Sequence, residues 1–214
     1  SVQVLDTNGN GRRDEYVEPG EPMDPTKDTR IEEEFYGDAP SPLDGSIWGS
    51  SRGFPGGIVR FVPGDDPVNT GLAEFYEVPG NDPDVLIKGF SPRGMDVDSN
   101  GVVWSVLSSG HLASFDRTQC QAPLNGPEAT GRHCSEGWTL HPFPGPNYKG
   151  AVASGSAESA YYTFVDRFDL LGVGENVPLS PGNESQSLQA LVDGEFKTFH
   201  VPYPLGGFHG KLLD

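Results

Sequence analysis

The chain has 214 residues, and its 14 basic and 31 acidic side chains give a formal net charge of −17. Such a surface would repel nucleic-acid phosphates, which argues against nucleic acid as a partner and favours a secreted or cation-binding protein. No apolar run approaches the about 20 residues that a membrane-spanning helix needs, so we expect no span in this chain. The 12 Phe, 7 Tyr and 3 Trp are spread along the whole length, which is typical of a folded domain.

The sharpest local pattern lies near the N-terminus. Oxygen-bearing side chains at loop positions 1, 3, 5 and 9, with glycine at position 6, are typical of the start of an EF-hand-type calcium loop. The segment also resembles the calcium loops of bacterial extracellular repeat domains. One departure is Val17, which stands where an EF-hand loop has its bidentate glutamate. The predicted Ca²⁺ ligands are Asp6, Asn8, Asn10, the backbone carbonyl of Arg12, Asp14 and Glu18.

We expect a bound calcium ion to be structural, because it would order an N-terminal segment (residues 1–30) that is otherwise too polar to fold. The alternative is a solvated turn rich in Asp and Asn. The neighbouring acidic residues Asp24, Asp28 and Glu32–Glu34 are interpreted as solvated surface.

The rest of the chain, residues 31–214, has the pattern of an all-β fold. Gly or Pro interrupts almost every window of ten residues, and apolar residues alternate over short spans rich in aromatic and β-branched side chains. Two stretches, Thr29–Phe35 and Tyr162–Leu171, could each form a helical turn. The clearest predicted strands are Gly57–Phe61, Ala73–Val78, Val102–Leu107 and Phe196–Val201.

These predicted strands belong to an internal sequence repeat. Asp44-Gly45-Ser46-Ile47-Trp48 matches Asn100-Gly101-Val102-Val103-Trp104, and in each copy a glycine, a second strand and a third strand ending in proline follow. A weaker third copy spans 187–202 and lacks the tryptophan. Repeated small sheets of this kind stack on one another to bury a shared core.

The second copy carries a family resemblance. Pro92–Trp104, continued by Gly110–Asp116, resembles the blades of streptogramin-lyase-like and NHL-type β-propellers. The resemblance implies β-propeller blades with the large aromatic residue packed between neighbours, and so few blades imply part of a larger propeller. The tryptophan spacing exceeds the about 40–45 residues of an ordinary blade, which predicts loop insertions. A compact, irregular β domain with propeller-like hairpins is the alternative.

The two cysteines, Cys120 and Cys134, lie in the second predicted insertion, residues 117–137. A disulfide here would close the insertion and stabilise the fold by about 3 kcal/mol in the chain-entropy model. It would also indicate an oxidising compartment, so we expect a secreted, periplasmic or cell-surface protein. Two free thiols are the alternative.

The sequence shows no recognisable group of catalytic residues. The streptogramin-lyase resemblance implies a histidine pair, a glutamate and Mg²⁺ near the propeller axis, but no histidine here lies in a close Glu-x-His arrangement. His111 is either a general base facing the channel or a packed histidine. We therefore expect an extracytoplasmic, calcium-stabilised β-propeller segment that acts as a binding or scaffold module. Its partner would be a protein or the remainder of a larger chain. The alternative is a metal-dependent lyase or lactonase-type hydrolase with its site on the propeller axis.

Overall fold

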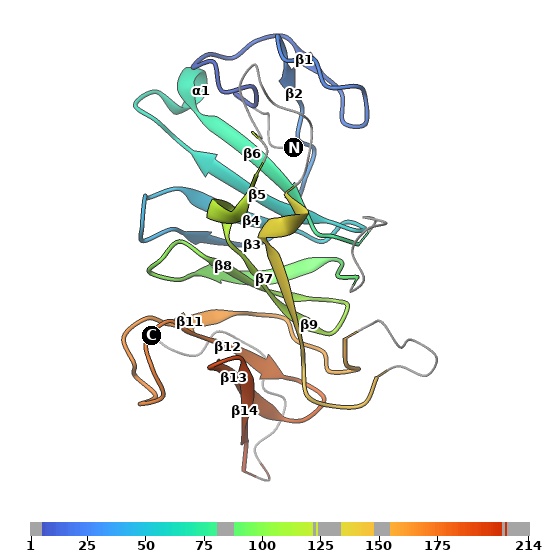
Figure 1. Cartoon of the computed structure of the whole chain (residues 1–214), viewed down its shortest axis with the longest axis vertical. Helices are drawn as coiled ribbons and strands as arrows, with labels where there is room; N and C mark the ends of the chain where they lie inside the picture. The colour runs from blue at the N-terminus through green and yellow to red at the C-terminus, as the bar shows by residue number, and fades with distance from the viewer. Residues whose placement is uncertain are drawn as a thin grey trace.

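The computed structural model describes residues 6–80, 88–121, 123, 134–147, 155–202 and 204. Within these ranges the chain forms three four-stranded antiparallel sheets, and the sheets follow one another in chain order along the long axis of the molecule (Figure 1). The all-β prediction and the propeller-like blades are confirmed. In each sheet, or blade, the strands are ordered as they occur in the sequence.

The first blade contains β3 (Phe35–Pro40), β4 (Ile47–Ser51), β5 (Gly57–Val62) and β6 (Leu72–Glu77). The second contains β7 (Pro92–Val97), β8 (Val103–Leu107), β9 (His111–Phe115) and β10 (Trp138–Pro142). The third contains β11 (Phe164–Asp166), β12 (Val177–Gly182), β13 (Ser187–Val192) and β14 (Glu195–His200). A short parallel pair, β1 (Tyr16–Val17) and β2 (Asp28–Thr29), lies beside the first blade. The short helices are α1 (Pro67–Thr70), η1 (Arg117–Gln119) and η2 (Ser135–Gly137).

The predicted Asp-Gly and Asn-Gly turns join the first and second strands of the first two blades. Gly45 and Gly101 have φ angles of 71° and 83°, a left-handed conformation that glycine adopts without a steric penalty. The third Asp-Gly pair, Asp193-Gly194, instead joins β13 to β14. The weaker third copy is therefore the second half of its blade, and that blade begins earlier, at Phe164.

The first strands of the three blades are neighbours. β7 packs against β3 on one side and against β11 on the other, as inner strands do around a propeller axis. Gly94 of β7 is required for this approach, because a Cβ there would lie 2.6 Å from the carbonyl oxygen of Tyr161. Its amide donates a hydrogen bond to that same oxygen at 2.8 Å.

The repeated tryptophans pack between blades, as the repeat predicts. Trp48 of β4 is 3% exposed and stacks on Tyr76, with ring centroids 5.8 Å apart, while Tyr76 contacts Phe115 of the second blade at 4.6 Å. Trp104 of β8 packs in the same way against the cluster that joins the second and third blades, including Leu112 and Leu191. Each such aromatic contact stabilises the fold by about 0.5–1.5 kcal/mol beyond its buried area.

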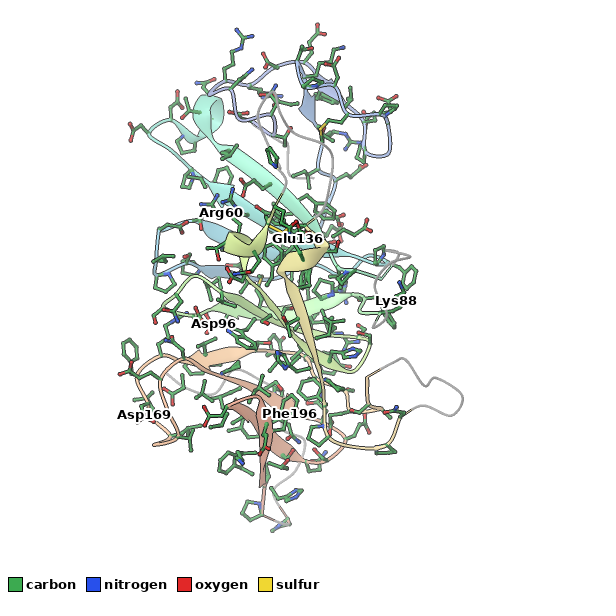
Figure 2. The ribbon with its side chains drawn as sticks, viewed as in Figure 1. Arg60, Lys88, Asp96, Glu136, Asp169 and Phe196 are labelled. Carbon is green, nitrogen blue, oxygen red and sulfur yellow. A yellow bond between two sulfur atoms is a disulfide. The ribbon has the colours of Figure 1, made fainter. Side chains whose placement is uncertain are left out.

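A charged contact also joins the second and third blades. The carboxylate of Asp96 accepts hydrogen bonds from the backbone N–H of Val165 at 2.9 Å and from the guanidinium of Arg167 at 2.5 Å. Asp96, labelled in Figure 2, thus lies where the two blades meet. Its neighbour Asp98 closes the β7–β8 turn by accepting from the N–H groups of Asn100 and Val102.

Two predicted features are wrong. Neither Thr29–Phe35 nor Tyr162–Leu171 is helical; the second contains β11, whose pairing with β12 overrides local helix propensity. β12 was not predicted at all, because Pro178 and Pro181 interrupt its pattern. None of the helices in the described ranges is long and apolar enough to cross a membrane.

Candidate functional site

The N-terminal loop, residues 6–14, forms the tight turn that its sequence predicts. The Asp6 carboxylate accepts the backbone N–H of Gly9 at 2.6 Å and that of Gly11 at 2.8 Å. The side-chain oxygens of Asn8 and Asn10 each accept the N–H two residues further on, both at 3.1 Å. These local bonds explain why Asp and Asn alternate through the turn.

Three of the predicted calcium ligands meet at one point of this loop. The amide groups of Asn8 and Asn10 donate to Oδ2 of Asp14 at 3.1 and 2.5 Å. These bonds, from Asn10 first and then Asn8, hold the pKa of Asp14 below its ordinary value, and the nearby Arg12 charge acts in the same direction. Rotating both amides by 180° would turn their oxygens toward Asp14, and the three side chains would then offer the oxygen ligands that Ca²⁺ prefers. The rotation would also break the bonds that the two oxygens accept from the N–H groups of Asn10 and Arg12.

Glu18 is held elsewhere: its carboxylate pairs with Arg30 at 2.6 Å. The side chain of Arg12, whose backbone carbonyl is the predicted ligand, lies at the meeting point, where its guanidinium pairs with Asp14 at 3.0 Å. Among the described residues, no three Asp, Glu, His or Cys side chains converge as they would in a preformed metal centre. The loop therefore fits calcium only if Asn8 and Asn10 supply oxygen ligands beside its carboxylates.

Asp28 is the residue of this region that the sequence analysis missed. It is 1% exposed, and its carboxylate accepts the backbone N–H of Thr7 at 2.9 Å and that of Asp14 at 2.7 Å. The interpretation of Asp28 as solvated surface is wrong, because these contacts bridge segments far apart in sequence, which no local pattern shows. Glu32 and Glu34, by contrast, are exposed as expected.

The loop is attached to the outer strand of the first blade. The carbonyl of Asp6 accepts the N–H of Ala73 at 2.8 Å, and Asp6 forms an isolated parallel bridge with Leu72 of β6. The conformation of the loop is thus linked directly to strand β6, which forms the edge of the first sheet.

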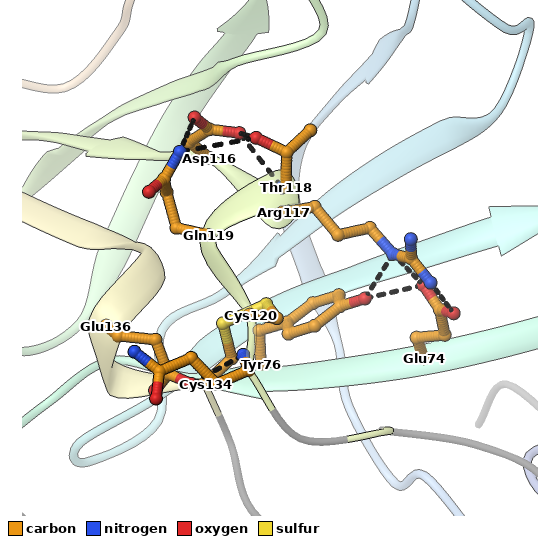
Figure 3. The surroundings of a disulfide bond; sticks show 10 residues. Glu74, Tyr76, Asp116, Arg117, Thr118, Gln119, Cys120, Cys134 and Glu136 are labelled. Carbon is orange, nitrogen blue, oxygen red and sulfur yellow. Dashed lines mark hydrogen bonds and ion pairs between the residues drawn. A yellow bond between two sulfur atoms is a disulfide. The ribbon is translucent and has the colours of Figure 1, made fainter.

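The two cysteines form a disulfide, with their Cα atoms 5.2 Å apart, so the free-thiol alternative is excluded (Figure 3). The bond joins η1 to η2, the two short helices on either side of the predicted insertion. Residues 122 and 124–133 of that insertion lie outside the described residues. The disulfide thereby holds the end of η1 next to the start of η2.

Next to the disulfide, an ion pair between buried Glu74 and partly exposed Arg117 joins the first two blades (Figure 3). Arg117 of η1 donates to the Glu74 carboxylate of β6 at 2.8 and 2.5 Å, and also to the Tyr76 hydroxyl at 2.7 Å. Burial acts to raise the pKa of Glu74, but the bonds from Arg117 and Tyr76 outweigh it and hold that pKa below its ordinary value. Burial also raises the pKa of Tyr76, so its hydroxyl stays protonated and donates to Glu74.

His111 is a packed histidine. It is 1% exposed, and its Nδ1 lies 3.0 Å from the Ser109 hydroxyl oxygen. Burial, with a smaller effect of His141, lowers the pKa of His111 to about 4, so the imidazole is neutral at pH 7. The packed alternative is therefore confirmed for this residue.

A pocket with a volume of about 450 Å³ opens where the first strands of the blades begin. It is formed by the start of β3, by the start of β7, by the segment before β11, and by the turns that follow β4 and β8. We call it the axial pocket, and it is lined by Tyr36, Arg52, Ser91, Arg93, Ser108 and Tyr161. The sequence analysis missed it because these residues are scattered over 36–161, and only the packing of the blades against one another brings them together.

Cation–π contacts order the axial pocket. The guanidinium carbon of Arg52 lies 4.8 Å from the ring centroid of Tyr36, and that of Arg93 lies 4.5 Å from the ring centroid of Tyr161. Burial, together with the hydroxyl of Tyr162, raises the pKa of Tyr36, whereas the charges of Arg93 and Arg52 act to lower it. Both guanidinium groups therefore act on the same hydroxyl.

These features define the chain as a set of β-propeller blades. No protein-family model matches the sequence, and no curated protein does either. Among solved structures, the selenomethionine-substituted virginiamycin B lyase from Staphylococcus aureus is similar, with a TM-score of 0.53 and 17% identity over 82% of this chain. A catalytically inactive variant of that lyase, bound to quinupristin, gives a TM-score of 0.48 and 14% identity over 77% of this chain. The chain spans 44% and 40% of the length of these two structures. At such identities the likeness shows the fold alone.

Proposed function

We propose that this chain is a calcium-stabilised β-propeller segment of an extracytoplasmic protein and acts as a binding module through its axial pocket. The observation that carries the proposal is the composition of that pocket. Tyrosine, arginine and serine side chains from the first two blades and from the segment before β11 line one cavity, and its volume is typical of small-molecule sites. Aromatic rings and arginine are the side chains most enriched where proteins recognise ligands and partners.

The remainder of a larger propeller, or another protein, is the proposed partner of this segment. Large apolar side chains are exposed on both outer blades of the described chain: Leu43 is 62% and Val68 65% exposed on the first, and Phe168 is 77% and Leu170 64% exposed on the third. Exposed apolar groups of this size are typical of surfaces that another chain or blade covers.

Calcium has a structural role in this proposal. The meeting of Asn8, Asn10 and Asp14 supports a site within the N-terminal loop, and the Asp6 contacts with β6 would transmit its order to the first blade. The disulfide supports an oxidising compartment, in which such bonds persist.

Thermal unfolding with and without calcium tests the structural part. For a calcium concentration 100 times Kd, binding to the folded state alone adds about 2.7 kcal/mol, which for a chain of this size raises Tm by roughly 5–10 °C. We expect this shift in wild type and its loss in Asp14→Asn. Asp65→Asn, an exposed carboxylate outside the loop, is the matched control and should keep the shift. An equal Tm in calcium and in EDTA would refute the calcium role.

A fragment screen observed by protein NMR tests the binding part. We expect hits of mixed chemistry to perturb the backbone signals of Tyr36, Arg93 and Tyr161 in preference to signals on the outer strands β6, β10 and β14. Hits that scatter over the surface, or no hits at millimolar concentration, would contradict a binding role for the axial pocket.

A second candidate function is a lyase activity at the propeller axis, favoured by the fold similarity to virginiamycin B lyase. The test is to incubate the full-length protein with quinupristin and Mg²⁺ and to follow the substrate by mass spectrometry and chromatography. Conversion of quinupristin would establish the lyase. An unchanged substrate after prolonged incubation would remove this candidate and leave the binding module.

A further inference from the structure

Two arginines of the axial pocket lack the carboxylate partners that most other described arginines of this acidic chain have. Arg30, Arg60, Arg117 and Arg167 each form ion pairs with Asp or Glu. Within the described ranges, neither Arg52 nor Arg93 forms an ion pair. With a net charge of −17, carboxylates are abundant, so two unpaired guanidinium groups at one cavity mark it as locally positive.

The surroundings hold these guanidinium groups in place without neutralising them. Each lies over a tyrosine ring, and Nη1 of Arg93 also donates to the carbonyl of Ala160 at 3.2 Å. The Ala160 carbonyl and the Tyr161 ring orient the Arg93 guanidinium, and the Tyr36 ring orients that of Arg52, while other N–H donors of each group stay available. A planar guanidinium with its orientation already fixed binds a carboxylate or phosphate with little further loss of entropy.

The two backbone segments that carry these arginines are also hydrogen-bonded to each other. Ser91 lies in the left-handed region with φ of 56°, which costs a non-glycine residue of order 1 kcal/mol. Its N–H donates to the carbonyl of Pro55 at 2.6 Å, and its hydroxyl donates to the carbonyl of Arg52 at 2.9 Å. The β4–β5 turn that carries Arg52 is thus bonded directly to the segment that leads into Arg93.

An apolar contact lies beside this charged region. The ring of Phe54, 75% exposed, packs on Phe90 with centroids 5.4 Å apart, and these two residues neighbour Arg52 and Ser91 in sequence. A ligand held by the arginines could therefore extend a flat, apolar part over tyrosine and phenylalanine rings.

We propose that the axial pocket binds a small ligand carrying an oxyanion, with the charged group between Arg52 and Arg93 and an aromatic or other flat part against Tyr36 and Tyr161. The inference rests on the proposed binding function and adds the chemical class of the ligand. Carboxylates and phosphate or sulfate esters share the chemistry that these two arginines recognise.

The test uses 4-fluorobenzoate, its neutral analogue 4-fluorobenzyl alcohol, and inorganic phosphate, with binding measured by ¹⁹F NMR and by competition. We expect 4-fluorobenzoate to bind at least tenfold more tightly than the alcohol and to be displaced by phosphate if the site accepts any oxyanion. Retention of bound 4-fluorobenzoate in the presence of phosphate would assign the site to carboxylates. Both results support the proposal.

Arg52→Gln and Arg93→Gln should each weaken 4-fluorobenzoate binding by about fivefold or more and leave binding of the alcohol unchanged. Lys197→Gln removes the same charge from the exposed strand β14 and should have no effect. Arg52 is exposed, so its variant keeps the test valid if Arg93→Gln does not fold.

Three outcomes would overturn the inference. Equal affinity for the acid and the alcohol would show a binding pocket without anion selectivity, and the proposed binding function would survive. An affinity for 4-fluorobenzoate that neither arginine variant changes would place the anion elsewhere. No binding of either probe at 10 mM would remove the oxyanion ligand, and the fragment screen would then decide separately whether the pocket binds anything.

Discussion

The contact between Glu74 and Arg117 provides the strongest stability test of how the first two blades are joined. Glu74→Gln keeps the shape of the side chain but removes its charge. The Glu74 side chain is 1% exposed and lies 2.5 Å from Arg117 and 3.2 Å from Arg60. Arg60 would keep a second carboxylate, Asp44 at 2.8 Å, whereas Arg117 forms no other ion pair within the described ranges.

The size of the effect follows from these distances and exposures. Removing one partner of a buried ion pair costs about 3–5 kcal/mol. The Arg117 side chain is 41% exposed, so water replaces part of the lost interaction and places the expected loss at about 3 kcal/mol or slightly less. For a chain of 214 residues this lowers Tm by roughly 6–10 °C.

The assay is urea unfolding at pH 7 of wild type, Glu74→Gln and Glu77→Gln, with hydrogen exchange as a second readout. Glu77 lies on the same strand and is not part of this ion pair, so its variant is the matched control. Because the folded-state pKa of Glu74 is lowered, its contribution is present above pH about 4.5 and is lost as the pH falls through that lowered value. A difference below about 0.5 kcal/mol between the two variants at pH 7 would show that the Glu74–Arg117 ion pair does not stabilise the contact between the first two blades.

Three further predictions concern the disulfide, a buried histidine and a close backbone approach. Reducing Cys120–Cys134 should lower the free energy of unfolding by about 3 kcal/mol, as followed by urea unfolding with and without reductant, and the double serine variant should no longer respond to reductant. His111 has a folded-state pKa of about 4 against 6.5 in the unfolded chain, so stability should fall by up to about 3 kcal/mol as the pH is lowered from 6.5 to 4. His111→Gln should remove that slope in urea unfolding, and an unchanged slope would assign it to other groups. Gly94→Ala should destabilise by more than 1 kcal/mol, since its Cβ would lie 2.6 Å from the Tyr161 carbonyl, whereas Gly172→Ala meets no atom within 4 Å and would be strained only by its φ of 67°.

The strands and their repeat could be predicted because their signals are local. Alternating apolar residues and Asp-Gly or Asn-Gly turns can each be recognised within ten residues of sequence. These two patterns predict most of the strands of the first two blades. The third blade was only half predicted, because Pro178 and Pro181 break the pattern of β12 and the tryptophan is missing. Both prolines are tolerated in a strand whose pairing with β11 and β13 fixes it from either side.

The candidate site was less predictable, and the reason is physical. The N-terminal loop could be recognised from Asp6–Asp14 alone, since its turn is made by bonds between near neighbours. Asp28 and the axial pocket could not, because their contacts join segments that meet only after the sheets have packed. Arg52 and Arg93, for example, are brought together by the packing of the first blade against the second, and no residue spacing in the sequence predicts that contact.

A crystal structure of the chain grown with calcium and 4-fluorobenzoate would test the blade arrangement, the calcium loop and the axial pocket together. We expect three blades whose first strands β3, β7 and β11 are neighbours, one cation at the Asp6–Asp14 loop, and the carboxylate between Arg52 and Arg93. The proposed function would be contradicted by a structure in which the first strands do not meet, the loop holds no cation and no ligand lies between the arginines.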